Sequence, residues 1–97
     1  MRIITKAPLR DFWEEHPSAK LPLQVWYKDT IKASWQTPND VKTQYGNASI
    51  VGNNRIVFNI KGNDFRLIVA INYAAGIVFI RFIGTHAQYD KINAATI

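Results

Sequence analysis

Residues at helical spacing dominate the first half of the chain. The β-branched segment Arg2–Lys6 is expected to form an edge strand. Pro8 suits the first turn of a helix, which Pro17 then ends. Ser18 is placed to cap a second helix, and Gln36–Asp40 is expected to be a loop with one more helical turn after it. The inner faces of the two helices carry Leu9, Phe12 and Trp13, followed by Leu23, Trp26, Tyr27, Thr30, Ile31 and Ser34.

The second half predicts strands joined by tight turns. Gly52–Asn54, Gly62-Asn63 and Ala75-Gly76 interrupt runs that are rich in Ile, Val and Phe. Two-residue turns at the second and third of these sites place facing residues on one uniformly apolar face. The expected pairs are Ile60 with Phe65, Phe58 with Leu67, Ile56 with Val69, Ile71 with Ile80, and Val69 with Phe82. This face is expected to pack on the two helices.

The opposite face of the predicted sheet carries the main functional signal. It combines Arg55, Asn59, Arg66 and Arg81 with Val57, Ile68, Ala70, Phe79 and Ile83. In this register Asn59 lies across from Arg66, and Arg81 lies across from Ala70. Three arginines without a carboxylate indicate a groove for phosphates, because a planar guanidinium binds phosphate oxygens in pairs. Phe79 and Tyr45 are candidate stacking platforms for bases. The plainer interpretation is a solvated face on which arginine stems cover apolar surface.

A short C-terminal helix is expected next to the arginines. Thr85 and Gln88 form a capping-box pattern, and the predicted register places Thr85 across from Arg66. His86, Tyr89 and Asp90 then share one helical face. His86 and Tyr89 are candidates for proton transfer, since histidine titrates near neutral pH, and the alternative is that these two residues only pack the helix on the sheet. The other histidine, His16, is interpreted as structural.

Composition narrows the class of protein. The 97 residues allow one domain, and 47% apolar with 20% charged residues excludes intrinsic disorder. The net charge of +5 and the pI near 9.8 favour an acidic partner. The absence of cysteine excludes disulfides and thiolate chemistry, and no apolar run is long enough for a membrane span or a signal peptide. We therefore expect a cytoplasmic domain that does not bind membranes.

The sequence lacks the motifs of several common kinds of active site. The chain has no HExxH, no Walker-type loop and no histidine–carboxylate set at metal spacing. We therefore predict no metal and no cofactor. If the protein is an enzyme, it works with His, Tyr, Arg and Lys.

Three segments together resemble one known family. The expected order of a strand, two helices packed on one face of an antiparallel sheet, and a short C-terminal helix resembles the α+β fold of RelE-like toxins. The segments RIITKAPLRDFWEEHP (2–17), FNIKGNDFRL (58–67) and FIRFIGTHAQYDKI (79–92) are similar to the HigB family of type II toxin–antitoxin systems. The resemblance covers nearly the whole chain, so residues 1–97 are interpreted as a single toxin domain.

The resemblance implies an mRNA interferase, an endoribonuclease that acts on mRNA in the translating ribosome. It also implies inhibition by a HigA-type helix-turn-helix antitoxin, with DNA contacted only through that complex. The implied roles are charge stabilisation by Arg66 and Arg81, proton transfer by His86 and Tyr89, support by Asp90, and RNA binding by Arg55, Asn59, Lys61, Asn63 and Lys91. Two alternatives remain at this stage. They are a non-catalytic RNA- or ribosome-binding module that uses the same basic face, and a structural domain that binds an acidic protein.

Overall fold

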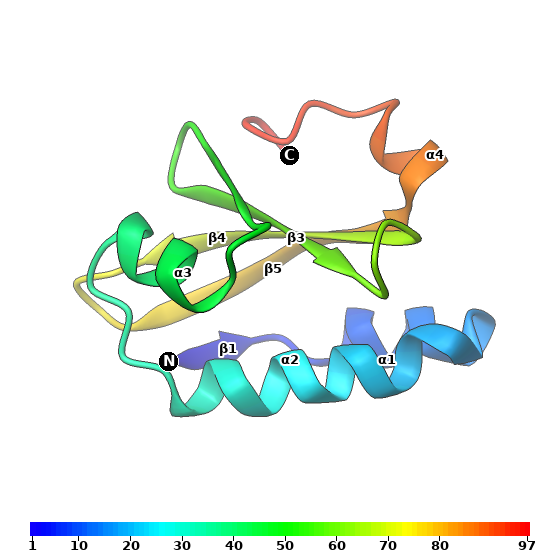
Figure 1. The fold of residues 1–97 in the computed structure, drawn as a ribbon, viewed down its shortest axis with the longest axis horizontal. Helices are drawn as coiled ribbons and strands as arrows, with labels where there is room; N and C mark the ends of the chain where they lie inside the picture. Colours follow the sequence, from blue (N-terminus) through cyan, green and yellow to red (C-terminus); the bar gives the residue numbers. More distant parts are fainter.

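The chain folds into a five-stranded sheet with its two longer helices on one face, as a computed structural model of all residues 1–97 describes (Figure 1). No helix has the length and apolar character that crossing a membrane requires. The elements are β1 (Arg2–Ile4), α1 (Ala7–Glu15), the 3-10 turn η1 (Pro17–Ala19), α2 (Lys20–Lys32), α3 (Pro38–Gln44), β2 (Ser49–Val51), β3 (Arg55–Ile60), β4 (Phe65–Asn72), β5 (Ile77–Thr85) and α4 (His86–Tyr89). The predicted α+β class and the order of its elements are confirmed.

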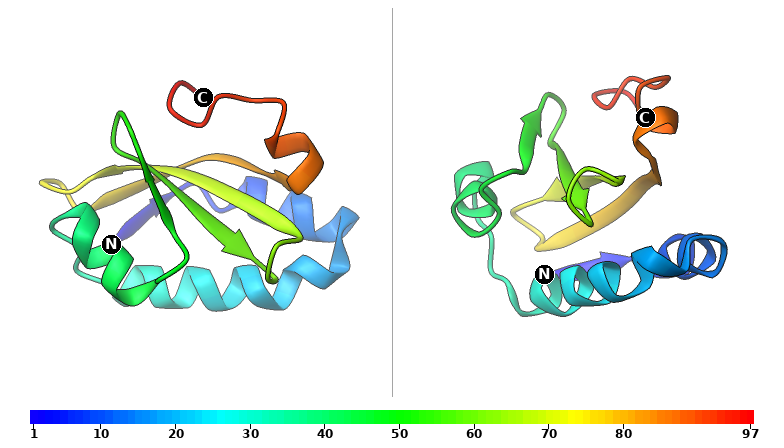
Figure 2. Two further views of the ribbon diagram at one scale, coloured as in Figure 1. Left: turned by 45° about the horizontal axis from the view of Figure 1, so that its top comes forward. Right: turned by 45° about the vertical axis from the view of Figure 1, so that its right-hand side comes forward.

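The sheet is mixed rather than purely antiparallel. Its strand order is β1-β5-β4-β3-β2, and β1 runs parallel to β5 at one edge while the other neighbours are antiparallel. The helices α1 and α2 lie against one face, and the segment after α4 crosses over the other (Figures 1 and 2). We call this second side the open face.

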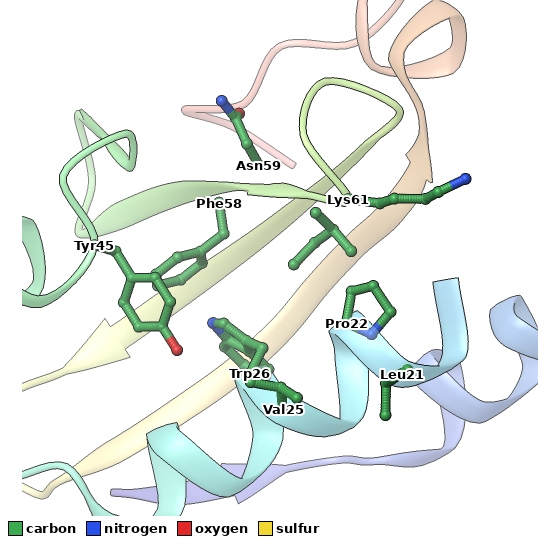
Figure 3. Close-up of a pocket in the computed structure, with 9 residues that line it drawn as sticks. Leu21, Pro22, Val25, Trp26, Tyr45, Phe58, Asn59 and Lys61 are labelled. Carbon is green, nitrogen blue, oxygen red and sulfur yellow. The ribbon is translucent and has the colours of Figure 1, made fainter. Parts of the chain in front are cut away.

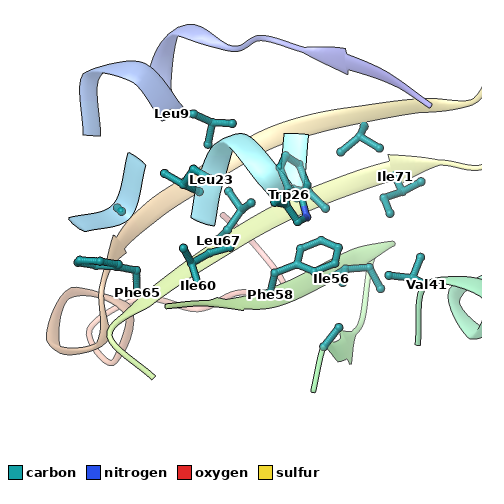
Figure 4. Packing of buried hydrophobic residues seen from close by; sticks show 14 of the residues in the cluster. Leu9, Leu23, Trp26, Val41, Ile56, Phe58, Ile60, Phe65, Leu67 and Ile71 are labelled. Carbon is teal, nitrogen blue, oxygen red and sulfur yellow. The ribbon is translucent and has the colours of Figure 1, made fainter. Parts of the chain in front are cut away.

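The predicted register of β3 with β4 is confirmed. Ile60 pairs with Phe65, Phe58 with Leu67, Ile56 with Val69, and Asn59 with Arg66. Only this pairing gives a continuous apolar face, and that face becomes the core (Figure 4). Phe58 and Leu67 are almost fully buried there, and Trp26 of α2 contacts Phe58 edge to face, with ring centroids 5.4 Å apart.

The predicted turn between β4 and β5 is wrong. Asn72 pairs with Ile77, which leaves the four residues 73–76 in the turn instead of two. The side-chain oxygen of Asn72 accepts the N–H of Ala75 at 3.0 Å, and Gly76 has a φ of +69°, which glycine adopts without strain. The pairs near this turn are therefore Ile71 with Val78 and Val69 with Ile80.

A β-bulge then shifts the register again. Val69 pairs with Ile80 and Ile68 with Phe82, so Arg81 is left between the pairs and does not face Ala70. Phe82 consequently lies on the open face, and Ile83, paired with Leu67, lies on the core side. Their predicted sides are thus exchanged. Thr85 pairs with Phe65 rather than Arg66, which pairs with Gly84 instead.

Two helix starts also differ from the prediction. Ser18 caps nothing, because it lies inside η1, and α2 begins without a side-chain cap. The helix α3 begins at Pro38, inside the predicted loop. Thr37 and Asp40 form a capping box there: the Asp40 N–H donates to Thr37 Oγ1 at 3.3 Å, and the Thr37 N–H donates to Asp40 Oδ2 at 3.2 Å.

Candidate functional site

Arg66 and Tyr89 come together at the end of the open face nearest the β3–β4 turn. The Arg66 guanidinium carbon lies 5.8 Å from the centroid of the Tyr89 ring, which is a cation–π contact. Its Nη1 also donates to the main-chain oxygens of Asn63, at 3.0 Å, and Phe65, at 3.3 Å. These contacts hold the guanidinium of the half-buried Arg66 beside the β3–β4 turn.

The start of α4 is fixed by its own sequence and by the β3–β4 turn. The Gln88 N–H donates to Thr85 Oγ1 at 3.2 Å, and the Thr85 N–H donates to Gln88 Oε1 at 2.9 Å, so the predicted capping box is confirmed. The main-chain N–H of His86 donates to the carbonyl of Asp64 at 3.1 Å. The turn and the helix therefore hold each other in place.

His86 is paired with Asp90 one turn further along the chain. Its Nδ1 lies 3.1 Å from Asp90 Oδ2, and both side chains are about half exposed. A carboxylate at this position orients the imidazole and favours the tautomer with hydrogen on Nδ1. The other nitrogen, Nε2, is then left to exchange a proton.

Gly84 is a site residue that the sequence analysis missed. It is buried opposite Arg66, where a Cβ would lie 2.5 Å from Cζ of Phe82 and 2.7 Å from Oε1 of Gln88. The lack of a side chain therefore allows the capping residue of α4 to approach the sheet. A glycine near the end of a strand, directly before a capping pattern, is the signal that was available for it.

Arg55 and Arg81 form a second group, around the C-terminal segment. The main-chain oxygen of Ile97 accepts from Arg55 Nη2 at 2.8 Å, from Arg55 Nε at 3.2 Å and from Arg81 Nε at 3.2 Å. Nearby, Asn53 Nδ2 donates to the Ala95 oxygen at 2.8 Å. We call Arg55 and Arg81 the arginine clamp and residues 93–97 the tail. Both guanidinium groups thus bind an oxygen atom on the open face. In the free protein this oxygen belongs to Ile97 and not to a ligand.

The tail lies over the same face (Figure 2). Val57 and Ile68 face this side and belong to no core cluster with the helices, yet they are only 2% and 0% exposed. Among the arginines of this face, Arg81 is exposed, whereas Arg55 and Arg66 are half-buried.

The remaining predicted RNA-binding residues surround these two groups. Lys61 is exposed and its Nζ lies 3.4 Å from Asp64 Oδ2, while Asn63 contributes its main-chain oxygen to Arg66. Asn59 faces Arg66 across the strands, and Lys91 is exposed just after α4. Of these four residues, only Lys61 and Lys91 are basic.

The two predicted stacking residues lie in different places. Phe79 is half-buried opposite Ala70 on the open face and, with Arg55, lines a hollow of about 210 Å³. The expectation for Tyr45 is wrong, because its ring packs on Phe58 on the helix side of the sheet, with centroids 5.2 Å apart. Its hydroxyl donates to Asp29 at 3.1 Å, and burial together with this carboxylate raises the pKa of Tyr45.

Two further features bear on the predicted chemistry. His16 stacks on Phe12, with ring centroids 4.4 Å apart, which agrees with a structural role. Nowhere do three or more His, Cys, Asp or Glu side chains gather as a metal site would require.

Comparisons with known proteins identify the family. Residues 19–92 match the model of the HigB toxin family, described as the RelE-like toxic component of a toxin–antitoxin system. The mRNA interferase HigB of Escherichia coli O6:H1 is 31% identical over 95 residues, which cover 96% of this chain and 92% of that protein. The mRNA interferase toxin HigB of Escherichia coli K12 is 26% identical over 96 residues, which cover 97% and 92%. The expected resemblance is thereby confirmed, and the chain belongs to the HigB family of RelE-like toxins.

Proposed function

We propose that this protein is an endoribonuclease toxin that cleaves mRNA on the translating ribosome and is neutralised by a HigA-type antitoxin. The observation that carries the proposal is the group formed by Arg66, Tyr89 and the His86–Asp90 pair. It combines a cation held by main-chain oxygens, a hydroxyl and an oriented imidazole at one end of a basic sheet face. The names of the relatives support the substrate, since several of them are mRNA interferases.

The proposed reaction is a transesterification within the RNA. The ribose 2′-oxygen forms a bond to the adjacent phosphorus while the bond from phosphorus to the 5′-oxygen breaks. His86 Nε2 takes the proton of the 2′-hydroxyl, and the Tyr89 hydroxyl gives a proton to the departing 5′-oxygen. Arg66 stabilises the charge that develops on the non-bridging oxygens. The products are a 2′,3′-cyclic phosphate and a 5′-hydroxyl, and DNA is spared because it lacks the nucleophile.

Arg81 takes a different role in this proposal from the catalytic one expected from the sequence. Its guanidinium joins Arg55 on the tail, and no contact links it to Arg66. We therefore assign the arginine clamp to a backbone phosphate of the RNA away from the scissile bond. The Ile97 oxygen accepts from Arg55 Nε and Nη2 and from Arg81 Nε, so RNA competes with the tail for these donors, while the two Nη atoms of Arg81 make no hydrogen bond within the chain.

The proposal is tested by adding the purified protein to ribosomes that translate a defined mRNA. We expect cleaved mRNA with cyclic phosphate and 5′-hydroxyl ends, together with growth arrest when the chain is expressed alone. Intact mRNA in the presence of folded protein would contradict the proposed activity, and 3′-hydroxyl with 5′-phosphate ends would contradict the mechanism.

The position of the arginine clamp also suits the alternative, an RNA- or ribosome-binding module without catalysis. The variants His86→Ala and Tyr89→Phe separate the two. Binding without catalysis predicts that both variants keep full effect on translation, whereas the proposed reaction predicts loss of cleavage with RNA affinity retained.

A further inference from the structure

A slot crosses the open face at Ala70, where three strands present their side chains in one row. Ala70 of β4 pairs with Arg55 of β3 on one side and with Phe79 of β5 on the other. Neighbouring strands lie about 4.8 Å apart, so the backbones at Arg55 and Phe79 are about 10 Å apart, with only a methyl group between them. We call this slot the Phe79 hollow. Its lining is Asn53, Asn54, Arg55, Ala70, Ile71, Asn72 and Phe79.

The Phe79 hollow has room for a planar ring. Its volume is about 210 Å³. For comparison, an apolar cavity of about 150 Å³ already binds benzene. None of residues 93–97 lines the hollow, although the tail is bound to Arg55 beside it. A ligand that enters the hollow therefore does not have to displace the tail.

The two long side chains of the row suit stacking. Phe79 provides a half-buried ring. The guanidinium of Arg55 is held by its edge, because Nε and Nη2 donate to the Ile97 oxygen and Nη1 donates to the Asn53 oxygen at 2.9 Å. Such hydrogen bonds lie in the guanidinium plane and leave its faces available. Unpaired nucleobases stack on exactly these two kinds of surface, aromatic rings and guanidinium planes.

Asparagine side chains from two turns add hydrogen-bonding groups. The exposed side chain of Asn54 makes no hydrogen bond within the chain. Asn72 uses only Oδ1, which accepts the Ala75 N–H at 3.0 Å, so its Nδ2 is free to donate. Asparagine amides pair with the edges of bases through a donor and an acceptor. No carboxylate lines the hollow, so a negatively charged backbone is not repelled there.

The larger groove between α2 and β3 lacks this combination (Figure 3). Its volume is about 390 Å³, and most of its lining is apolar. No arginine lines it, and its one cation, Lys61, already lies 3.4 Å from Asp64 Oδ2. The features that suit a base therefore belong to the open face.

We propose that the Phe79 hollow binds one unpaired nucleobase of the RNA, stacked between Phe79 and Arg55, with its edge at the free amides of Asn54 and Asn72. The identity of the ligand rests on the proposed function. Along β4 the hollow lies four residues from Arg66, which is about 13 Å. This distance is several times the rise of about 3.4 Å between stacked nucleotides. The bound base therefore belongs to neither nucleotide at the scissile bond, and the hollow sets a base preference away from the cut.

The first test measures the binding of RNA that cannot be cleaved. One probe is a single-stranded 2′-O-methyl RNA hexamer of mixed sequence, and the other is a hexamer of the same backbone without bases. We expect the NMR signals of the Asn54 and Asn72 side-chain amides to shift with the first probe only. Phe79→Leu should weaken its binding about tenfold, whereas Phe79→Tyr, which keeps a ring, should retain the affinity. Equal affinity of Phe79→Leu and the wild type would overturn the stacking.

The second test measures the base preference of cleavage on ribosomes that translate a pool of randomised mRNAs. Asn54→Gly removes the amide without backbone strain, since Asn54 has a φ of +60°, which glycine adopts freely. Asn47→Ala is the matched control, because Asn47 is exposed and does not line the hollow. We expect the wild type and Asn47→Ala to share a base preference at one fixed distance from the cut. Asn54→Gly should lose the preference at that position alone, and an unchanged preference would overturn base reading by Asn54.

The outcomes separate the base site from the proposed function. Equal affinity of the wild type for the two hexamers, with mRNA cleavage intact, overturns the base site and leaves the activity standing. A wild-type protein that binds neither hexamer overturns the base site as well. Base-dependent binding at the Phe79 hollow by a protein that cleaves no mRNA contradicts the proposed activity alone.

Discussion

Replacement of Gly84 by alanine should loosen the C-terminal helix from the sheet. The added Cβ would lie 2.5 Å from Cζ of Phe82 and 2.7 Å from Oε1 of Gln88, whereas carbon atoms in favourable contact are about 3.5–4.0 Å apart. The Phe82 ring must therefore move by about 1 Å, or Gln88 must leave the Thr85 N–H. Overpacking of this kind costs about 1–3 kcal/mol, and loss of a cap adds about 1 kcal/mol. The free energy of unfolding should fall by about 2–4 kcal/mol.

The assay is denaturant unfolding followed by tryptophan fluorescence, with Gly46→Ala as the control. A Cβ at Gly46 meets no atom within 4 Å, and this glycine does not have a positive φ. Gly46→Ala should therefore be neutral or slightly stabilising, by up to about 1 kcal/mol, through the lower entropy of the unfolded chain. Under the proposed function, Gly84→Ala should also slow RNA cleavage, because α4 carries His86 and Tyr89. Equal stability of the two variants would refute the close approach of α4 to the sheet.

Three further results are expected. Because the pKa of Tyr45 is raised in the folded state, the unfolded chain loses this proton first as the pH rises past about 10, so the free energy of unfolding should fall there. Tyr45→Phe should flatten that fall, and an unchanged alkaline slope would contradict the raised pKa of Tyr45. Lys61→Ala should weaken RNA binding and lower the slope of log affinity against log salt by about one, and an unaltered slope would remove Lys61 from the interface. Deletion of residues 93–97 should strengthen RNA binding by freeing the arginine clamp, whereas weaker binding by folded protein would show that the tail supports the face.

The strand pairing shows which parts of the sheet register the sequence pattern can predict. The register of β3 with β4 was predictable, because a short turn and a period of two leave one pairing that keeps every apolar residue on one side. The register of β4 with β5 was not, since a longer turn and the bulge at Arg81 each shift the pairing. A bulge has no fixed sequence signature. For this reason the faces predicted for Phe82 and Ile83 are the reverse of those in the structure.

Some features of the candidate site were likewise predictable from the sequence and others were not. The start of α4 was predictable from Thr85 and Gln88, since capping is local in the sequence. The hydrogen bond from His86 to the Asp64 carbonyl and the arginine clamp on the Ile97 oxygen were not predictable. Both use main-chain oxygens, which every residue has. Only the path of the chain in space decides which of these oxygens meets a donor.

The central claim is that Arg66 stabilises the transition state of RNA cleavage, and its most direct test is the single-turnover rate. Arg66→Ala, confirmed as folded and used at saturating concentration on a ribosome-bound mRNA, should cleave a few hundred times more slowly than the wild type. This corresponds to about 3–4 kcal/mol, the usual cost of removing one such charge-stabilising contact. A cleavage rate equal to that of the wild type would contradict the account and reduce Arg66 to a residue that only binds RNA.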